Sequence, residues 1–152
     1  MTTPLVLLVD DNEADLMLAL AAIELSSLKA DVCIARDGEE ALEFLRRSGR
    51  HANRPDNDPS VVLLDLNMPR MNGLEVLSII RADASLRRIP VVMLTTSAEQ
   101  QDIDASYERG SNAYVVKPVS FDGTVEAMRT LAAFWTMLNN TVTPKNGAGR
   151  SS

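Results

Sequence analysis

The chain has 152 residues, which is enough for one domain with a full hydrophobic core and leaves little room for a second. Its 45% apolar and 24% charged residues are ordinary for a globular protein, and its net charge of -6 argues against nucleic acid as a general partner. The single cysteine, Cys33, excludes an internal disulfide and fits a reducing cytoplasm.

The chain starts with a short apolar run, Leu5–Val9, that two acidic residues follow at once. The run has no basic segment before it and is too short for a signal peptide or a membrane-spanning helix. It therefore predicts a buried strand, and we expect a cytoplasmic protein that does not associate with membranes.

Short runs rich in β-branched residues alternate with segments of helical periodicity. The runs are Leu5–Val9, Asp31–Ala35, Val61–Leu64, Val91–Leu94 and Ala113–Val116. Uniformly apolar runs of this length favour strands that are covered on both faces, as in a parallel sheet. The helical faces between and after them are Leu16, Leu20 and Ile23; Ala41, Leu42 and Leu45; Leu74, Leu77 and Ile80; Ile103 and Tyr107; and Val125, Met128, Leu131, Ala132, Trp135 and Leu138. Five such units predict an α/β, doubly wound fold with a five-stranded parallel sheet and five helices.

Two polar segments have no apolar period. Residues 48–60 contain two prolines and predict a surface loop, in which His51, the only histidine, is expected to be solvated. The end of the chain, TVTPKNGAGRSS, has the composition of a disordered tail. We therefore expect one domain over residues 1–140 and a flexible tail over residues 141–152, with no room for a DNA-binding module.

Polar residues follow the predicted strands at the edge where functional groups of open parallel sheets gather. They are Asp10 and Asp11 after the first strand, Asp65 after the third, Thr95 and Thr96 after the fourth, and Lys117 and Pro118 after the fifth. Three carboxylates, a hydroxyl group and an ammonium group should thus meet at one edge. Neighbouring carboxylates repel unless a cation is present, and oxygen ligands select Mg²⁺ or Ca²⁺.

This set of groups suits phosphoryl transfer. A carboxylate can act as a nucleophile and form an aspartyl phosphate, and Asp65 is placed to do so. Phosphoryl transfer then needs positioning and charge neutralisation around the phosphoryl oxygens. A metal ion on Asp11 and Asp65, the Lys117 ammonium and the Thr95 hydroxyl would each serve one oxygen.

Each residue also has a plainer interpretation. Asp10 and Asp11 could cap the first helix, and Lys117 could be a lysine that extends from a strand end into solvent. Asp65 is harder to explain in this way, because it ends an apolar run where an unpaired charge is costly. The joint placement of these residues at one edge favours the chemical interpretation.

Four stretches resemble the receiver domains of two-component response regulators, across residues 4 to about 138: LLVDDNEAD, VVLLDLNMPRMNGLEVL, IPVVMLTTSA and GSNAYVVKP. The resemblance implies a flavodoxin-like fold with strand order 2-1-3-4-5 and a Mg²⁺-dependent phosphoacceptor at Asp65. Asp10 and Asp11 would be the acid pair of the metal site, and the carbonyl of Asn67 a further metal ligand.

The same resemblance assigns the switch residues. Thr95 would be the switch hydroxyl, and Lys117 the lysine of the family, joined to Pro118 by a cis bond. Tyr114 falls at the switching aromatic position and would turn inward when Thr95 moves toward the phosphoryl group. We expect a single-domain response regulator that signals by a conformational change and is not a turnover enzyme.

Within the family, the chain is similar to single-domain regulators paired with phytochrome-type histidine kinases. The carrying features are ARDGEEALEFLRR, the long loop after it, ASLRRIPVVMLTTS and the late Ala133-Phe134-Trp135. The likeness implies a sensor histidine kinase, such as a bacteriophytochrome, as partner and a homodimer through helix 4, strand 5 and helix 5. Apolar area could come from Tyr107, Val119, Phe121, Phe134 and Trp135; alternatively, the last two merely close the core.

Two rival functions remain open at this point. One is a phosphorylation-independent scaffold, although a scaffold has no need of repelling carboxylates. The other is an aspartyl-phosphate phosphatase, which usually needs an acid or base two residues after the nucleophile. That position is Asn67, which cannot do this work.

Overall fold

The computed structural model describes residues 3–26 and 29–138. Its centre is a five-stranded sheet of order β2-β1-β3-β4-β5 in which all neighbouring strands are parallel. The elements are β1 Leu5–Val9, α1 Glu13–Leu25, β2 Asp31–Ala35, α2 Gly38–Arg46, β3 Val61–Leu64, α3 Gly73–Ala82, β4 Val91–Thr95, α4 Gln100–Glu108, β5 Ala113–Val116 and α5 Phe121–Ala133. The predicted fold, strand order and helix number are confirmed.

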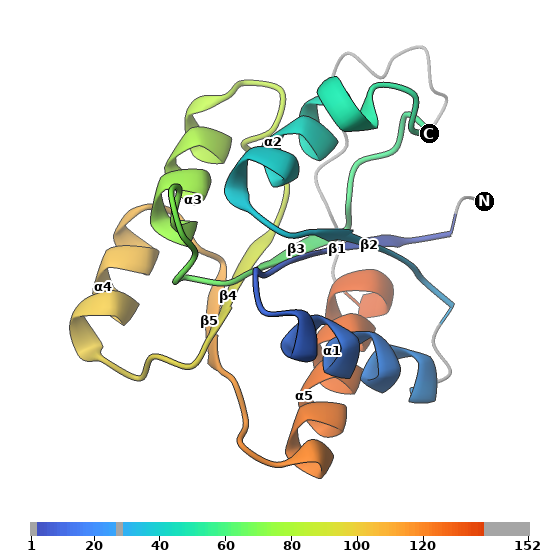
Figure 1. The fold of residues 1–152 in the computed structure, drawn as a ribbon, viewed down its shortest axis with the longest axis vertical. Coiled ribbons are helices and arrows are strands. Elements are labelled where there is room, and N and C mark those ends of the chain that lie inside the picture. The colour runs from blue at the N-terminus through green and yellow to red at the C-terminus, as the bar shows by residue number, and fades with distance from the viewer. Residues whose placement is uncertain (1–2, 27–28, 139–152) are drawn as a thin grey trace.

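The helices cover both faces of the sheet, with α1 and α5 on one face and α2 and α3 on the other, while α4 lies beside β5 (Figure 1). Successive side chains of a strand point to opposite faces, so each strand feeds two cores. In β1, Leu7 and Val9 pack toward α2 and α3, whereas Val6 and Leu8 pack toward α1 and α5. This double burial explains why every residue of the central strands β1, β3 and β4 is buried, whereas most residues of the edge strands β2 and β5 are only half-buried.

The loop after β3 is fixed against its own strand by a glycine. A Cβ atom at Gly73 would lie 2.3 Å from the carbonyl oxygen of Asp65, so only glycine allows this approach. Asn72 and Glu75 form a capping box that starts α3 at this point. The start of α3 thus holds the chain next to Asp65 in place.

The long polar segment is more ordered than its composition indicated. It contains a short 3₁₀ helix, Gly49–His51, and folds back along α2. The expectation that His51 is solvated is wrong: its Nε2 lies 3.0 Å from Oε2 of Glu40, and its ring packs edge-on against Phe44. The Arg54 guanidinium lies over the same Phe44 ring, 4.1 Å from its centre.

The last two helices also differ from expectation. In α4 only Ser106 is buried, and Tyr107, on the predicted apolar face of this helix, is 50% exposed. α5 continues into a π-helical segment, Phe134–Leu138, in which Trp135 packs against the core between α1 and α5 and Phe134 stays 45% exposed. The aromatic pair is therefore divided between core and surface.

No helix among residues 3–26 and 29–138 is long and apolar enough to cross a membrane. The predicted tail over residues 141–152, and the domain limit at residue 140, lie outside the described residues.

Candidate functional site

Three carboxylates meet at the carboxyl edge of the sheet. Asp10 and Asp11 follow β1 and Asp65 follows β3, and one oxygen from each residue lies within 4.8 Å of the others. Asp10 and Asp65 are buried, at 7% exposure each, and Asp11 is exposed. Oxygens at this spacing, open to solvent on the Asp11 side, fit a hard cation such as Mg²⁺.

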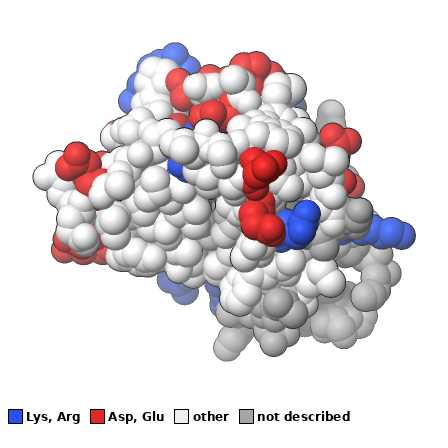
Figure 2. Space-filling view, turned by 90° about the horizontal axis from the view of Figure 1, so that it is seen from below, with Lys and Arg blue, Asp and Glu red and all other residues white. Residues whose placement is uncertain are grey.

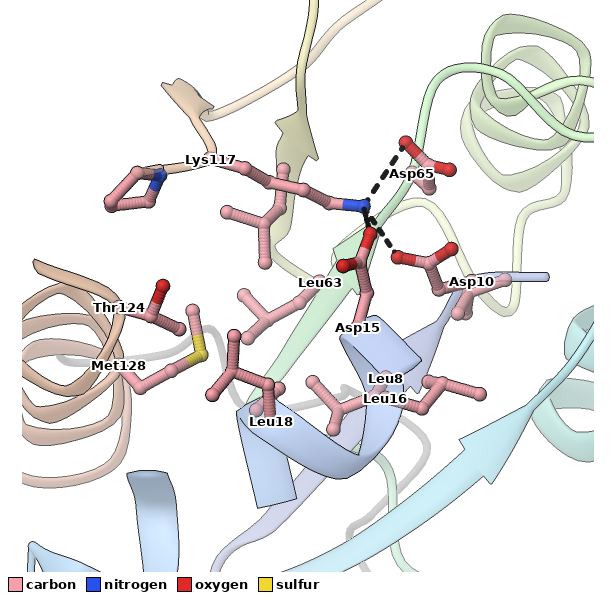
Figure 3. A pocket seen from close by; sticks show the side chains of 14 residues that line it. Leu8, Asp10, Asp15, Leu16, Leu18, Leu63, Asp65, Lys117, Thr124 and Met128 are labelled. Atoms are coloured by element: carbon pink, nitrogen blue, oxygen red, sulfur yellow. Dashed lines mark hydrogen bonds and ion pairs between the residues drawn. The ribbon is translucent and has the colours of Figure 1, made fainter. Parts of the chain in front are cut away.

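The ammonium of Lys117 enters this cluster from the end of β5 (Figure 3). Its Nζ lies 2.6 Å from Oδ2 of Asp10, 2.8 Å from Oδ2 of Asp15 and 3.8 Å from Oδ1 of Asp65. Burial lowers the pKa of Lys117, but the hydrogen bonds to Asp10 and Asp15 and the charges of Asp65 and Asp10 together outweigh it, so the pKa lies above its usual value. The lysine therefore remains a cation inside the cluster.

Asp65 has an unfavourable environment for its negative charge. Burial, followed by the neighbouring charge of Asp10, raises its pKa from 3.8 to about 7, although the Lys117 ammonium and the Asn67 backbone N–H act in the opposite direction. The Lys117 ammonium is shared among Asp10, Asp15 and Asp65, so it does not fully compensate the charge of any one of them. Asp65 is thus the carboxylate that gains most from an added cation.

A chain of hydrogen bonds runs from the end of β4 to β5 and α4 through Ser97. The Ser97 N–H donates to Oγ1 of the fully buried Thr95 over 3.3 Å, and the hydroxyl of Tyr114 donates to the Ser97 carbonyl over 2.9 Å. The Ser97 hydroxyl donates to Asp102 in α4 over 2.6 Å. Thr95, Tyr114 and α4 are therefore joined through one residue of the β4–α4 loop.

A family model of the response regulator receiver domain matches residues 6–129. The chain belongs to this family.

The chain is similar to the response regulator Rcp1 and to response regulators of a phytochrome and of a bacteriophytochrome. Rcp1 of a Synechocystis strain is 38% identical over 86% of this chain and 87% of its own, and its Mn²⁺-bound structure superposes with a TM-score of 0.83. The phosphorylated cyanobacterial phytochrome response regulator RcpA is 36% identical, with a TM-score of 0.86 over 93% of this chain and 100% of its own. The bacteriophytochrome response regulator AtBRR is 50% identical over 92% of this chain and 100% of its own, with a TM-score of 0.75. The likeness to phytochrome-associated regulators is confirmed.

The receiver's predicted site residues fall into two groups. Asp10, Asp11, Asp65 and Lys117 come together in one cluster. Thr95 and Tyr114 connect with each other through Ser97, while Asn67 lies exposed two residues after Asp65. The roles assigned to all of these residues remain predictions.

The alternative interpretation, in which Asp10 and Asp11 cap the first helix, is wrong. The cap of α1 is Asn12, whose side chain accepts the N–H of Asp15 over 3.1 Å. Asp10 instead accepts the N–H of Asn12 and the ammonium of Lys117. Lys117 is likewise no solvent-directed lysine, since its side chain is only 14% exposed.

One predicted detail of the site is wrong. The Lys117–Pro118 peptide bond is trans and not cis. Trans is the intrinsically preferred form even before proline, by about 0.5–1 kcal/mol. In this form the Lys117 N–H donates to the Thr95 carbonyl over 2.7 Å, which continues the pairing of β5 with β4.

The sequence interpretation missed Asp15. An acid in the first turn of a helix is ordinarily explained by the helix dipole, so the sequence alone did not indicate a role for Asp15 in the site. The available signal was the helix itself: α1 starts at the carboxyl edge of the sheet, and its first turn must therefore border the acid cluster.

Proposed function

We propose that this receiver accepts a phosphoryl group on Asp65 from a sensor histidine kinase and signals by a conformational change. An Asp65 carboxylate oxygen forms the bond to phosphorus, and the bond between phosphorus and the kinase histidine nitrogen breaks, so the histidine leaves. The observation that carries the proposal is Asp65 itself, a buried carboxylate next to two others and to the Lys117 ammonium. An uncompensated carboxylate at an open edge is suited to chemistry and unsuited to a purely structural role.

Asp10, Asp11 and Asp65, with the carbonyl of Asn67, would hold a Mg²⁺ ion. When bound, the ion would offset the negative charge of the phosphoryl oxygens. Lys117 stays close enough to Asp65, at 3.8 Å, to approach a phosphoryl oxygen there.

The conformational signal would use the connections of Ser97. A phosphoryl group on Asp65 adds acceptor oxygens that attract both the Lys117 ammonium and the Thr95 hydroxyl. Because the Ser97 N–H is bonded to that hydroxyl, and Ser97 in turn to Tyr114 and Asp102, a shift of Thr95 would reach β5 and α4. The weakly packed α4 is the element that such a shift moves most easily.

The partner kinase is proposed to be of the phytochrome type, and the protein to act in the cytoplasm, where such kinases phosphorylate their regulators. The support is the phytochrome association stated for RcpA and AtBRR, which cover more than nine tenths of this chain. Asn67, which has no acid or base function, supports a switch that is not a turnover enzyme.

The face formed by α4, β5 and α5 is the surface that we propose for a second copy of the chain. Seen from below, wide uncharged areas separate the charged groups, and the blue groups form no continuous stripe on this part of the described surface (Figure 2). That pattern favours apolar contact with protein over binding of nucleic acid. The large apolar side chains exposed along these elements are Tyr107, Val116, Val119, Phe121 and Phe134.

Incubation of the protein with acetyl phosphate and Mg²⁺ should give one phosphoryl adduct by intact mass. The adduct should be absent when Mg²⁺ is chelated and in Asp65→Asn, because the nucleophile is lost. Asp58→Asn, which removes an exposed carboxylate outside the site, should behave as wild type. An adduct of equal yield in Asp65→Asn would refute Asp65 as the acceptor.

A further inference from the structure

Asp15 competes with Asp65 for the Lys117 ammonium. The distance from Nζ to the nearest Asp15 oxygen is 2.8 Å, against 3.8 Å to the nearest Asp65 oxygen. The closer contact is a charge-assisted hydrogen bond and the longer one is an ion pair without a hydrogen bond. The ammonium is therefore held between Asp10 and Asp15, on the α1 side of the cluster.

The local structure fixes Asp15 for this contact. It is the third residue of α1, and its backbone N–H is held by the side chain of the cap residue Asn12. The neighbouring acid Glu13 points elsewhere and pairs with Arg36 over 2.9 Å, with both side chains more than half exposed. Only one of the two acids in this turn is thus directed at the lysine.

The lysine also has room to move. A small cavity of about 50 Å³ lies beside its side chain, lined by Asp10, Asp15, Asp65 and apolar residues between α1 and α5 (Figure 3). Figure 3 shows Lys117 reaching over this space, with Leu63, Leu16 and Met128 below it. The side chain of Lys117 thus borders unfilled space and is not closely packed on this side.

We infer that Asp15 is a positioning residue that holds Lys117 away from Asp65 and so opposes the phosphorylated state. The inference rests on the proposed function. To bind a phosphoryl oxygen on Asp65, Lys117 must break its hydrogen bond to Asp15. The free energy of that hydrogen bond reduces the net stabilisation that Lys117 gives to the acyl phosphate. Asp15 thereby sets how strongly the receiver favours its unphosphorylated state.

The test is the affinity for beryllofluoride, which stands in for the phosphoryl group on Asp65, measured by fluorine NMR titration with Mg²⁺ present. Asp15→Asn should bind it about twofold to fivefold more tightly than wild type, the range for a partly exposed ion pair. Asp15→Glu, which keeps the charge, should return toward the wild-type affinity. Glu13→Gln removes the same charge from the same helical turn and should change the affinity less than the Asp15 substitution.

A double-mutant cycle separates positioning from a general charge effect. In the Lys117→Ala background, Asp15→Asn should lose most of its effect, because the residue acts through the lysine. An equal gain in both backgrounds, or no gain in Asp15→Asn while wild type binds beryllofluoride, would overturn the inference and leave the proposed function standing. If wild type binds no beryllofluoride and takes no phosphoryl group, the proposed function fails as well.

Discussion

Replacing Asp65 with Asn should stabilise the metal-free protein at pH 8. The pKa of Asp65 is raised to about 7, chiefly by burial and by Asp10, so its charged form is disfavoured in the folded state. A neutral side chain of the same shape removes that penalty. We expect a gain of about 2–4 kcal/mol in the free energy of unfolding, or roughly 5–10 °C in Tm, measured by circular dichroism in chelator.

The pH dependence of this gain follows from the direction of the shift. Below pH 3.8 Asp65 is protonated in both the folded and the unfolded chain, and the two proteins should be equally stable. As the pH rises toward 7, the unfolded chain loses the proton first, so wild type loses stability relative to Asp65→Asn. The difference should grow across this window and level off above pH 7.

Mg²⁺ provides the control for this prediction. The ion should stabilise wild type more than Asp65→Asn, because the variant lacks one carboxylate of the cluster. Asp58→Asn removes an exposed carboxylate and should shift the midpoint little at any pH. A variant of Asp65 that is less stable than wild type at pH 8 would show that its charge is compensated in the fold.

Replacing Lys117 with Met should have the opposite effect on stability. The ammonium contacts Asp10, Asp15 and Asp65, and its removal leaves buried carboxylates without their cation. Loss of one partner of such a buried pair costs about 3–5 kcal/mol. We expect a loss of this size at pH 8 by urea denaturation, with much of it recovered on addition of Mg²⁺.

The exposed lysine of the described chain offers a matched comparison for this substitution. Lys29→Met removes the same charge away from the cluster and should leave the unfolding midpoint nearly unchanged. A Lys117→Met protein as stable as Lys29→Met, with no added response to Mg²⁺, would contradict the assignment of the ammonium as the cation of the acid cluster.

The fold was largely predictable because its three central strands, β1, β3 and β4, are buried on both faces. Their continuous apolar runs, such as Val61–Leu64, contrast clearly with the helical period between them, and the observed bounds agree to within a residue. Prediction was weakest where burial is weak. Tyr107 follows the helical period of α4, yet this helix buries only Ser106. The periodic pattern in α4 therefore does not identify residues of the hydrophobic core.

The site was predictable as far as strand ends determine it. Asp10, Asp65 and Lys117 meet because parallel strands deliver their carboxyl ends to one edge. The positions of the strand ends do not predict contacts that depend on the direction of a side chain. Asp15 and the pair of His51 with Glu40 arise from how a helix turn and a long loop lie against neighbouring elements, which local sequence does not specify.

The central claim is that Asp65 carries the phosphoryl group. Borohydride reduces an aspartyl phosphate to homoserine, so reduction after treatment with acetyl phosphate and Mg²⁺, followed by peptide mass spectrometry, marks the acceptor residue. We expect homoserine at position 65 and unchanged aspartate at Asp10 and Asp11. Homoserine at either of those positions, with Asp65 unmodified, would contradict the central claim.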